Sequence, residues 1–447
     1  MGVPIEIEVE NIFGDYEHLF NRSARIFVGY SGGLDSTVLL HLTCKYAKAG
    51  RVTALHVNHG LSSDADVWEQ HAERQSDELS ANFEAHRVSC QARINTEALA
   101  RDARYGVFEK TLAEDDILLL AHHADDQAET VLYNLLRGSG STGMSGIPVT
   151  RDLGLGRLLR PLLGRTKAQI KSYATRHRLK WIEDESNLDT SFDRNYLRHR
   201  ILPLIAERWT GHQNRIAVTA SQSKNDKSLA KSIFLNDLAK LDFRNDRAGI
   251  SFCAKRMSLL EAIRQKNIIR QLPGELKLSL PSTRVIDEVF DVLLNARSDA
   301  SPEVKADRCV FRRYRNRVYL LRVGKRHSIC PKNCINWELK KMLVLPGGGS
   351  VVAESIDSQG IRLGEVTSLE IRFRLGGERC RPSGRRHSQT LKKLFQEYAL
   401  EPWWRSSIPL FFLHNELVAV GDLWVCEGWE TEKGEKGLKI HWQVNSL

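Results

Sequence analysis

The sequence predicts an α/β protein: an N-terminal doubly wound parallel sheet, then a helical domain and a small C-terminal α+β domain. Two observations support this prediction. Apolar runs of strand length alternate with helical patterns up to about residue 140, and beyond residue 347 short β-like runs appear among glycines and tryptophans. Continuous apolar strands that alternate with helices are typical of a parallel sheet covered by helices on both faces.

The elements of the N-terminal part follow in a regular order. Strands are expected at 25–30, 52–57, 83–89 and 117–121. Helices are expected at 37–49, 64–81, 96–114 and 125–137, the first of them closed by Gly50. A glycine-rich flexible loop is expected over 138–146, followed by helices over 166–178 and 195–206.

The remaining chain divides by composition. Residues 215–300 are mostly helical in pattern and carry scattered lysines and arginines, and 325–336 looks like a linker. A length of 447 residues suits two or three domains. We therefore expect an α/β domain over 1–214, a helical domain over 215–335 and a small α+β domain over 345–447, with β-like runs at 369–374 and 417–420.

Charge and cysteine usage limit the function classes. The formal net charge is +10, which favours acidic partners such as nucleic acid. The eight cysteines form no C-x-x-C pair, so a disulfide framework or zinc site is not expected. The N-terminus lacks a signal-peptide pattern, and no run reaches the roughly 18 apolar residues of a membrane span. We expect a cytoplasmic protein without a membrane partner.

The sharpest local signal is the loop Ser31-Gly32-Gly33-Leu34-Asp35-Ser36, which lies between a predicted strand and a predicted helix. Its glycines allow a tight turn, and free N–H groups at a helix start attract phosphate. A carboxylate suits such a loop when Mg²⁺ bridges it to phosphates. The loop has no lysine and is not a Walker A motif. The ordinary structural alternative is a capped helix start after a glycine turn.

This hexapeptide resembles the PP-loop of the ATP-pyrophosphatase superfamily, whose signature is S-G-G-x-D-S. The resemblance implies the adenine nucleotide alpha hydrolase-like fold. It also implies that ATP is cleaved between its α and β phosphates. In that superfamily an oxygen of the acceptor is adenylated, pyrophosphate leaves, and a nucleophile then displaces AMP.

Several further segments resemble the tRNA(Ile)-lysidine synthetase family within that superfamily. They are His56-Val57-Asn58-His59-Gly60-Leu61, Ala100-Arg101-Asp102-Ala103-Arg104-Tyr105, His122-His123-Ala124-Asp125-Asp126-Gln127-Ala128-Glu129-Thr130, Arg160-Pro161-Leu162-Leu163, Glu183-Asp184 with Ser186-Asn187, Arg194-Asn195 with Arg198, Lys392-Lys393-Leu394-Phe395 and Pro402-Trp403-Trp404-Arg405. The resemblance covers most of the chain and is thin only over about 215–340.

The resemblance implies a specific reaction. Free L-lysine would be ligated to C2 of the wobble cytidine, position 34, of an isoleucine tRNA with a CAU anticodon. The reaction would use ATP and Mg²⁺, pass through an adenylated cytidine, and release AMP and pyrophosphate. How this tRNA is told from the similar methionine tRNA stays open, and so does the oligomeric state, with a homodimer as one option.

The resemblance also implies roles for individual residues. Asp35 would coordinate Mg²⁺, and the ATP site would comprise Ser31, Gly32, Gly33, Leu34, Asp35, Ser36 and Asn58. The acids Asp125, Asp126 and Glu129 crowd one strand end and helix turn, where open α/β sheets bind ligands. With Asp35 they are the candidate catalytic residues, and which of the three binds lysine or acts as base is left open. Helix capping is the ordinary alternative.

Two basic groups are candidate tRNA contacts. In the N-terminal part they are Arg101, Arg104, Arg194 and Arg198, and in the C-terminal part Arg379, Arg381, Arg385, Arg386, Lys392 and Lys393. Basic clusters with interleaved aromatic residues suit RNA backbone and stacking contacts. The alternative is a solvated face over a core built on tryptophans, and adjacent tryptophans such as Trp403 and Trp404 more often pack than stack on bases.

Two other function classes remain. One is another PP-loop enzyme, such as a tRNA thiolase or an amidotransferase. Thiolases of the two-thiocytidine type carry C-x-x-C pairs that this chain lacks, and Gly2 stands where some amidotransferases expose a cysteine nucleophile. The other is a non-catalytic tRNA-binding protein with a decayed loop, against which the intact Asp35 and both flanking serines argue.

Overall fold

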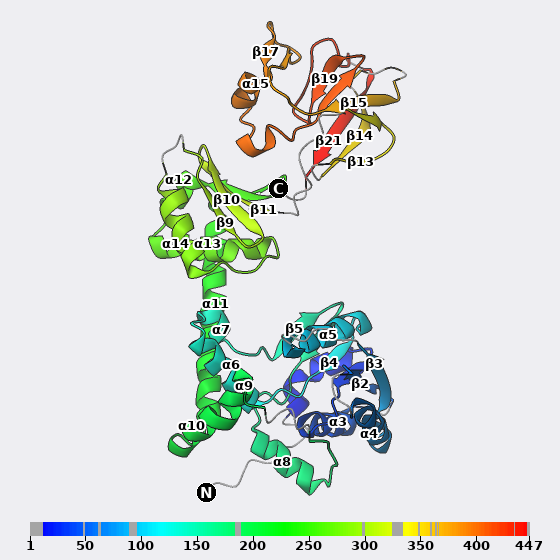
Figure 1. Ribbon diagram of the computed structural model, residues 1–447, viewed down its shortest axis with the longest axis vertical. Helices are drawn as coiled ribbons and strands as arrows, with labels where there is room; N and C mark the ends of the chain where they lie inside the picture. Colours follow the sequence, from blue (N-terminus) through cyan, green and yellow to red (C-terminus); the bar gives the residue numbers. More distant parts are fainter. Residues whose placement is uncertain are drawn as a thin grey trace. The chain divides into compact units, whose positions relative to one another are not determined.

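The computed structural model describes residues 12–47, 50–60, 64–88, 96–183, 189–296, 300–323, 334–346, 349–357, 360–362, 364, 366–432 and 434–444 (Figure 1). The chain forms two compact units, Met1–Leu229 and Ala230–Leu447. The boundary falls within one long helix, α11 (His212–Leu238). The second unit contains more than one hydrophobic core, and the three-domain division at 214 and 335 stays a prediction.

The first unit is built on a six-stranded sheet in the order β3-β2-β1-β4-β6-β5. Its parallel strands are β1 (Ile26–Gly29), β2 (Val52–Asn58), β3 (Asn82–Arg87), β4 (Ile117–Leu119) and β6 (Gly156–Leu159). The edge strand β5 (Thr150–Leu153) runs antiparallel to β6. The four predicted strands are therefore confirmed, and the β5–β6 hairpin extends the sheet beyond them.

Helices cover both faces of this sheet, as a doubly wound fold requires. They are α3 (Leu34–Tyr46), α4 (Ala65–Glu78), α5 (Thr96–Thr111) and α8 (Lys167–Arg176). The helix α6 (Ala124–Leu136), which follows β4, packs instead with the short helices over 141–144 and 193–201 (Figure 1). Side chains alternate along a strand, so Ile26 and Val28 lie in a cluster with residues of α3 and α8, whereas Phe27 packs with Phe108 of α5. The predicted fold class is thus confirmed for this part of the chain.

Short elements complete the first unit. They are η1 (Gly14–Tyr16), α2 (Glu17–Arg22), α7 (Ser141–Met144), α9 (Asp193–Tyr196), the π-helical η3 (Leu197–Ile201) and α10 (Leu202–Arg208). The helix predicted over 195–206 is present as the run α9–η3–α10. The predicted loop over 138–146 contains one helical turn, α7, because Gly143 and Met144 both donate backbone hydrogen bonds to Gly140 O, each at 3.0 Å.

The first part of the second unit combines helices with a sheet. Its helices are α12 (Ala254–Met257), α13 (Ala262–Glu275), α14 (Thr283–Glu288) and the π-helical η4 (Val289–Leu294). They pack on an antiparallel sheet in the order β7-β8-β11-β10-β9, with bounds β7 (Arg244–Asp246), β8 (Gly249–Cys253), β9 (Glu303–Ala306), β10 (Cys309–Tyr314) and β11 (Arg317–Arg322).

The middle domain contains the expected helices and, in addition, a sheet that was not predicted. Helices do dominate 215–300, but β7 and β8 lie within that stretch and pair in one sheet with β9, β10 and β11, which follow it. Each strand is at most six residues long, and β10 carries consecutive arginines, Arg312 and Arg313, so none shows a long apolar run. Strand pairing at long sequence separation overrides the local pattern here.

The C-terminal part confirms the predicted short strands. One sheet has the order β12-β15-β18-β19-β20, with β12 (Ile335–Glu338), β15 (Ser368–Arg372), β18 (Leu410–Leu413), β19 (Glu416–Val420) and β20 (Trp424–Val425). A second comprises β13 (Leu343–Val344), β14 (Ser350–Asp357) and β21 (Lys436–Gln443). A hairpin of β16 (Arg379–Cys380) and β17 (Gln389–Thr390), the helix α15 (Leu391–Glu397) and η5 (Pro402–Trp404) complete it.

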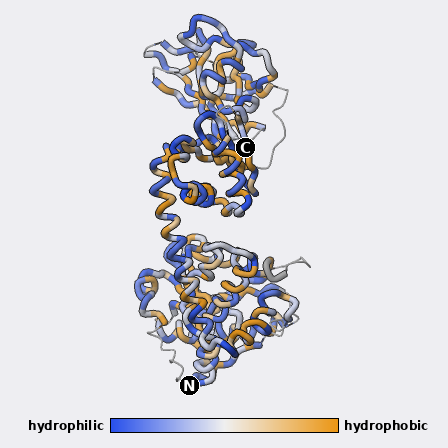
Figure 2. The backbone as a smooth tube through the Cα atoms, turned by 90° about the vertical axis from the view of Figure 1, so that its left-hand side faces the viewer, coloured by the Kyte–Doolittle hydropathy of each residue, from blue (hydrophilic) through white to orange (hydrophobic). Residues whose placement is uncertain are grey.

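Hydropathy and cavities add two observations. Hydrophobic and hydrophilic stretches alternate along α11 in Figure 2, and many of its side chains are exposed.

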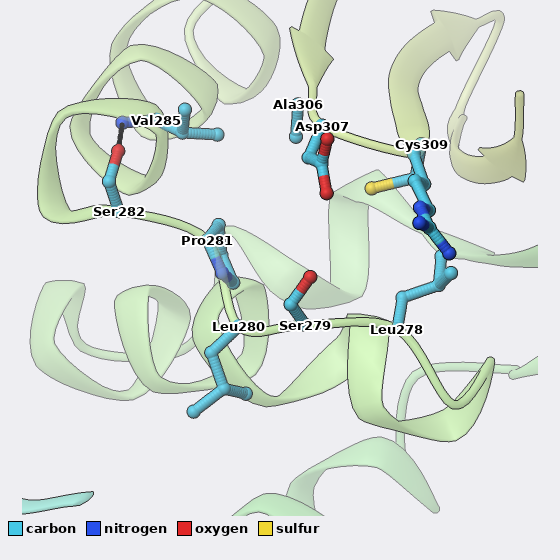
Figure 3. A pocket seen from close by; sticks show the side chains of 10 residues that line it. Leu278, Ser279, Leu280, Pro281, Ser282, Val285, Ala306, Asp307 and Cys309 are labelled. Atoms are coloured by element: carbon cyan, nitrogen blue, oxygen red, sulfur yellow. Dashed lines mark hydrogen bonds between the residues drawn. The ribbon is translucent and has the colours of Figure 1, made fainter. Parts of the chain in front are cut away.

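Within the second unit, a cavity of about 210 Å³ is lined by Leu278–Ser282, Val285 and 306–309 (Figure 3). At its edge Val285 N donates to Ser282 Oγ at 3.4 Å, which caps the start of α14. None of the helices in the described ranges is both long and apolar enough to cross a membrane.

Candidate active site

The loop between β1 and α3 is held by its own hydroxyl groups. Gly32 has a φ of +81°, a backbone conformation that favours glycine. The Ser31 and Ser36 hydroxyl oxygens lie 3.1 Å apart, and Ser36 Oγ donates to Gly33 O at 3.0 Å. Gly33 N donates to Ser31 Oγ at 3.4 Å. The helix begins at Leu34 without a side-chain cap, which leaves its first N–H groups available for an anion.

A segment far along the chain supports this loop. Ile182 N donates to Gly32 O at 2.9 Å, and Gly33 forms a parallel β-bridge with Ile182. The sequence had singled out the neighbouring Glu183-Asp184 with Ser186-Asn187, of which 184–188 lie outside the described residues. The supporting role of Ile182 is carried by backbone atoms, so no side-chain motif could have revealed it.

His123 connects the loop to the acids that follow β4. Its Nε2 lies 3.6 Å from Asp35 Oδ2 and 3.6 Å from Asp126 Oδ2. Asp126 N donates to His123 Nδ1 at 3.4 Å, so Nε2 is the nitrogen that carries a proton toward Asp35. Burial acts to lower the pKa of His123, but the nearby carboxylates of Asp35, Asp126 and Asp125 outweigh it and raise that pKa.

Asp35 retains an unused acceptor. Its side chain is about one-third exposed, with 32% accessibility, yet Oδ1 is buried and has no hydrogen-bond partner among the described residues. Buried carboxylate oxygens are normally paired. An unpaired oxygen at the first turn of a helix next to an anion-binding loop fits a cation that also touches the bound anion.

Glu129 and Arg198 form a bidentate ion pair. Arg198 Nε donates to Glu129 Oε1 at 2.6 Å, and Nη2 donates to Glu129 Oε2 at 2.9 Å and to Asp126 Oδ1 at 3.3 Å. Burial raises the pKa of Glu129 although Arg198 opposes this. The structure thus brings together three predicted site residues, Asp126, Glu129 and Arg198. Nε and Nη2 of Arg198 donate to these two acids, so these nitrogens already have acceptors within the protein.

Asp125 accepts one hydrogen bond from a backbone N–H and one from a side-chain amide. Its Oδ2 accepts from Lys167 N at 2.8 Å and its Oδ1 from the amide of Gln213 at 3.1 Å. The carboxylate therefore ties the starts of α8 and α11 to the start of α6. It is 27% exposed at the side chain and lies 3.7 Å from His123 Nδ1. Asp125 and Asp126 are the more accessible of the three acids.

The end of β2 lies beside a second histidine pair. Asn58 is buried and donates to Glu69 Oε2 at 2.8 Å, while its oxygen accepts from Gly60 N at 2.9 Å. His56 Nδ1 bonds the Tyr30 carbonyl at 2.9 Å, which fixes β2 to the residue before the loop. The amide of Asn58 is thus occupied, and any part it plays in an ATP site is through the shape of the strand end.

Arg104 meets the same strand end. Its Nε lies 3.3 Å from His59 Nε2. Burial and the charge of Arg104 lower the pKa of His59 to about 4, so this imidazole is neutral and accepts from the guanidinium. Arg101 and Arg194 form no ion pair within the described residues.

The contacts of one buried arginine, Arg160, were not apparent from the sequence. Arg160 is 3% exposed and donates to His122 Nδ1 at 3.1 Å and to the Tyr105 hydroxyl at 3.2 Å. Three separate segments that resemble the family contain these residues: Tyr105 lies in 100–105, His122 in 122–130 and Arg160 in 160–163. Their shared place in family-like segments was the sequence feature that could have pointed to this contact. His122 directly precedes His123, so the hydrogen bond between Arg160 and His122 lies one residue along the chain from the histidine that contacts Asp35.

The C-terminal basic residues divide into paired and unpaired groups. Arg385 forms an ion pair with Glu397, Arg381 lies 3.7 Å from Glu427, and Arg379 donates to Ser388 O at 3.0 Å. In the described part of the chain, Arg386, Lys392 and Lys393 are exposed and make no ion pair. They remain the most available cations for an external anion.

The two adjacent tryptophans serve packing. Trp404 is buried and meets Trp442 edge-on at 6.0 Å between ring centroids. Trp403 packs against Tyr319 of β11 at 5.0 Å, with Arg312 over its ring at 5.2 Å. Their packing role matches the alternative given to them at the outset.

Comparison with known proteins places this geometry in a family. Family models match in three places: a PP-loop domain over residues 1–205, a TilS substrate binding domain over 252–319 and a TilS substrate C-terminal domain over 369–442. Among solved structures, the U34-tRNA thiolase NcsA from Methanococcus maripaludis is similar over 48% of this chain and 77% of its own, with 16% identity and a TM-score of 0.40.

Two curated relatives extend the match over nearly the whole chain. The tRNA(Ile)-lysidine synthase of Coxiella burnetii is 37% identical over 422 residues, covering 93% of this chain and 92% of that protein. The tRNA(Ile)-lysidine synthase of Pseudomonas fluorescens is 38% identical over 423 residues, with the same 93% and 92% coverage. The family predicted from the sequence is confirmed. The chain therefore belongs to the tRNA(Ile)-lysidine synthase family of ATP-using, tRNA-modifying ligases.

Proposed function

We propose that this enzyme ligates free L-lysine to C2 of the wobble cytidine, position 34, of an isoleucine tRNA with a CAU anticodon. O2 of the cytidine attacks the α-phosphorus of ATP and pyrophosphate leaves. The ε-amine of lysine then attacks C2, the amine loses a proton, and AMP leaves. The observation that carries the proposal is the buried, unpartnered Oδ1 of Asp35 at the PP-loop, beside His123.

The loop residues would bind ATP through backbone and hydroxyl donors. Ser31, Gly32, Gly33, Leu34 and Ser36 form the turn at the start of α3, where free N–H groups favour phosphate. Asp35 would hold Mg²⁺ through its free oxygen, together with phosphate oxygens of the nucleotide. Mg²⁺ held there would supply positive charge that offsets the charge of the phosphates. Asn58 would border the adenosine by shaping the end of β2.

The three acids differ in what they can do. Glu129 has both oxygens bound to Arg198 and is 4% exposed at the side chain, so we assign it to positioning Arg198. Asp125 and Asp126 keep partial exposure, at 27% and 21%, and lie close to His123. They are the acids suited to attract the ammonium group of lysine, and a carboxylate there can also accept the proton that the amine loses.

The remaining chain would hold the tRNA. We propose catalysis within 1–214 and tRNA binding by 215–335 and 345–447, in the cytoplasm, where the tRNA is found. Arg101, Arg104 and Arg194 would face tRNA phosphates near the site. Arg379, Arg381, Arg385, Arg386, Lys392 and Lys393 would form a second contact area in the C-terminal part. Whether a homodimer forms is a separate question that sedimentation would answer.

The adenylated intermediate can be trapped by leaving out lysine. With ATP labelled at the α-phosphate, Mg²⁺ and an isoleucine tRNA carrying CAU, label should accumulate on the tRNA. Adding unlabelled lysine should release it as AMP. Label on a transcript with uridine at position 34, or sulfide-dependent AMP release without lysine, would reject the proposal in favour of another PP-loop chemistry.

The C-terminal contact area is testable by charge reversal. We expect Arg386→Glu, Lys392→Glu and Lys393→Glu together to weaken tRNA binding at least about tenfold near 0.05 M salt, because up to three phosphate contacts are lost. ATP affinity should not change. A control variant, Lys436→Glu, makes a single charge reversal on β21 of the second sheet, to be compared with each of the three reversals made singly, and should have little effect. Equal tRNA affinity for the triple variant and the wild type would contradict this role.

A further inference from the structure

Three arginines converge on the ring of Tyr105. Arg101 and Arg151 place their guanidinium carbons 5.1 Å and 4.9 Å from its centroid. Arg160 Nη2 donates to its hydroxyl group at 3.2 Å. These cations come from three separate segments: α5, which also carries Tyr105, the edge strand β5, and the residue that follows β6. In Figure 1, α5 and β5 carry neighbouring labels, in agreement with these contacts.

Arg160 is buried without a counter-charge. At 3% exposure it donates to His122 Nδ1 at 3.1 Å, to Pro148 O at 2.7 Å and to Tyr105. All three acceptors are uncharged, since burial and the charge of Arg160 lower the pKa of His122 to about 3. No carboxylate in the described ranges forms an ion pair with Arg160. A guanidinium has five N–H donors, so further donors are available.

Nearby acidic groups do not neutralise the other two arginines. Asp152 follows Arg151 directly, but its Oδ1 lies 3.7 Å from Arg157 Nε across the hairpin. Arg101 and Arg151 are exposed and make no ion pair within the described part of the chain. A buried charge without a partner costs several kcal/mol, and like charges close together add to this cost. A bound anion would offset both costs.

We propose that Arg101, Arg151, Arg160 and the hydroxyl of Tyr105 form a phosphate-binding site for the backbone of the tRNA substrate. Guanidinium groups bind phosphate through paired N–H donors. The cluster adjoins the proposed catalytic residues, because His122, bonded to Arg160, directly precedes His123 beside Asp35. Two of the three arginines are exposed, which favours a large ligand over the phosphates of ATP. The inference deepens the proposed function and rests on tRNA being the substrate.

Salt dependence of tRNA binding tests the site, with Arg151→Ala as the main variant. Loss of one phosphate contact should lower affinity about tenfold near 0.05 M salt and reduce the slope of log K against log salt by about one. Arg157→Ala is the matched control, because it removes an arginine from the neighbouring strand that is paired with Asp152. This control should keep the wild-type slope. Arg101→Ala should act like Arg151→Ala.

The outcomes distinguish a phosphate of the tRNA backbone from a phosphate of ATP as the ligand of this site. A smaller slope with unchanged ATP affinity supports the tRNA assignment. Unchanged slopes in both Arg151→Ala and Arg101→Ala, or reduced ATP affinity with normal tRNA binding, would overturn it. Both positions are exposed, and thermal unfolding will verify that each variant is folded. Because tRNA binding is measured without lysine, failure of the proposed chemistry would not affect this result.

Discussion

Asp35→Asn should abolish tRNA-dependent AMP release, with a loss of at least about a thousandfold. The substitution keeps the shape of the side chain but removes the negative charge. The site then loses the one carboxylate oxygen at the PP-loop that is buried and unpartnered. If that oxygen holds a cation against the phosphates of ATP, the amide will hold it far more weakly. Lysine transfer and AMP formation should fall together.

The fold should survive this change. Among the residues that the structure describes, Asp35 makes one ion contact, to His123 at 3.6 Å, and its side chain is partly exposed. The unfolding temperature of Asp35→Asn should therefore lie close to that of the wild type. Asp152→Asn, on the edge hairpin, controls for removing a carboxylate elsewhere and should leave activity intact. An Asp35→Asn enzyme that retains more than about a tenth of wild-type activity would rule out the role given to Asp35.

Arg198→Ala should be the most destabilising single change at the site. It leaves Glu129 buried and unpaired, a situation that typically costs about 3–5 kcal/mol. In a unit of this size the thermal midpoint should fall by roughly 10 °C. The double variant Arg198→Ala with Glu129→Ala removes the stranded charge and should recover part of the loss. Additive effects of the two substitutions would show that the ion pair does not stabilise the unit.

The same variant has a predicted pH dependence. Burial raises the pKa of Glu129 in the folded state, and Arg198 opposes this. Without Arg198 the folded pKa rises further above the unfolded value, so the protonated carboxyl is favoured in the folded state. The stability deficit should be largest above the folded pKa and should shrink as the pH falls toward the unfolded pKa. A deficit that grows on acidification would contradict this linkage.

The sheet of the first unit was predictable because its strands are locally distinct. Each of β1, β2 and β4 is a short apolar run, and a helical pattern follows it, so composition and order agree. The β5 strand was not predictable, because Arg151 and Asp152 make this edge strand polar. The sheet of β7 to β11 was not predictable either, because it depends on pairing between β8 and β11, which lie more than sixty residues apart in the sequence.

Local motifs predicted that the acids of the site group near one another, but not which residues they contact. Asp35 lies in the first turn of α3, Asp125 and Asp126 lie in the first turn of α6, and Glu129 lies further along α6. Their partners come from distant segments, such as Arg198 for Glu129 and Gln213 for Asp125. Only the folded chain shows that both carboxylate oxygens of Glu129 accept hydrogen bonds from Arg198, whereas Asp35 Oδ1 has no partner among the described residues. The assignments of individual roles stay predictions.

The most direct test of the proposed function is transfer of labelled lysine to tRNA. The enzyme would be given ATP, Mg²⁺, labelled L-lysine and isoleucine tRNA transcripts that differ only at position 34. We predict that label becomes bound to the transcript with cytidine at that position, with one AMP released per lysine transferred, and that the uridine transcript takes up none. Equal labelling of both transcripts, or AMP release without lysine transfer, would contradict the proposed function.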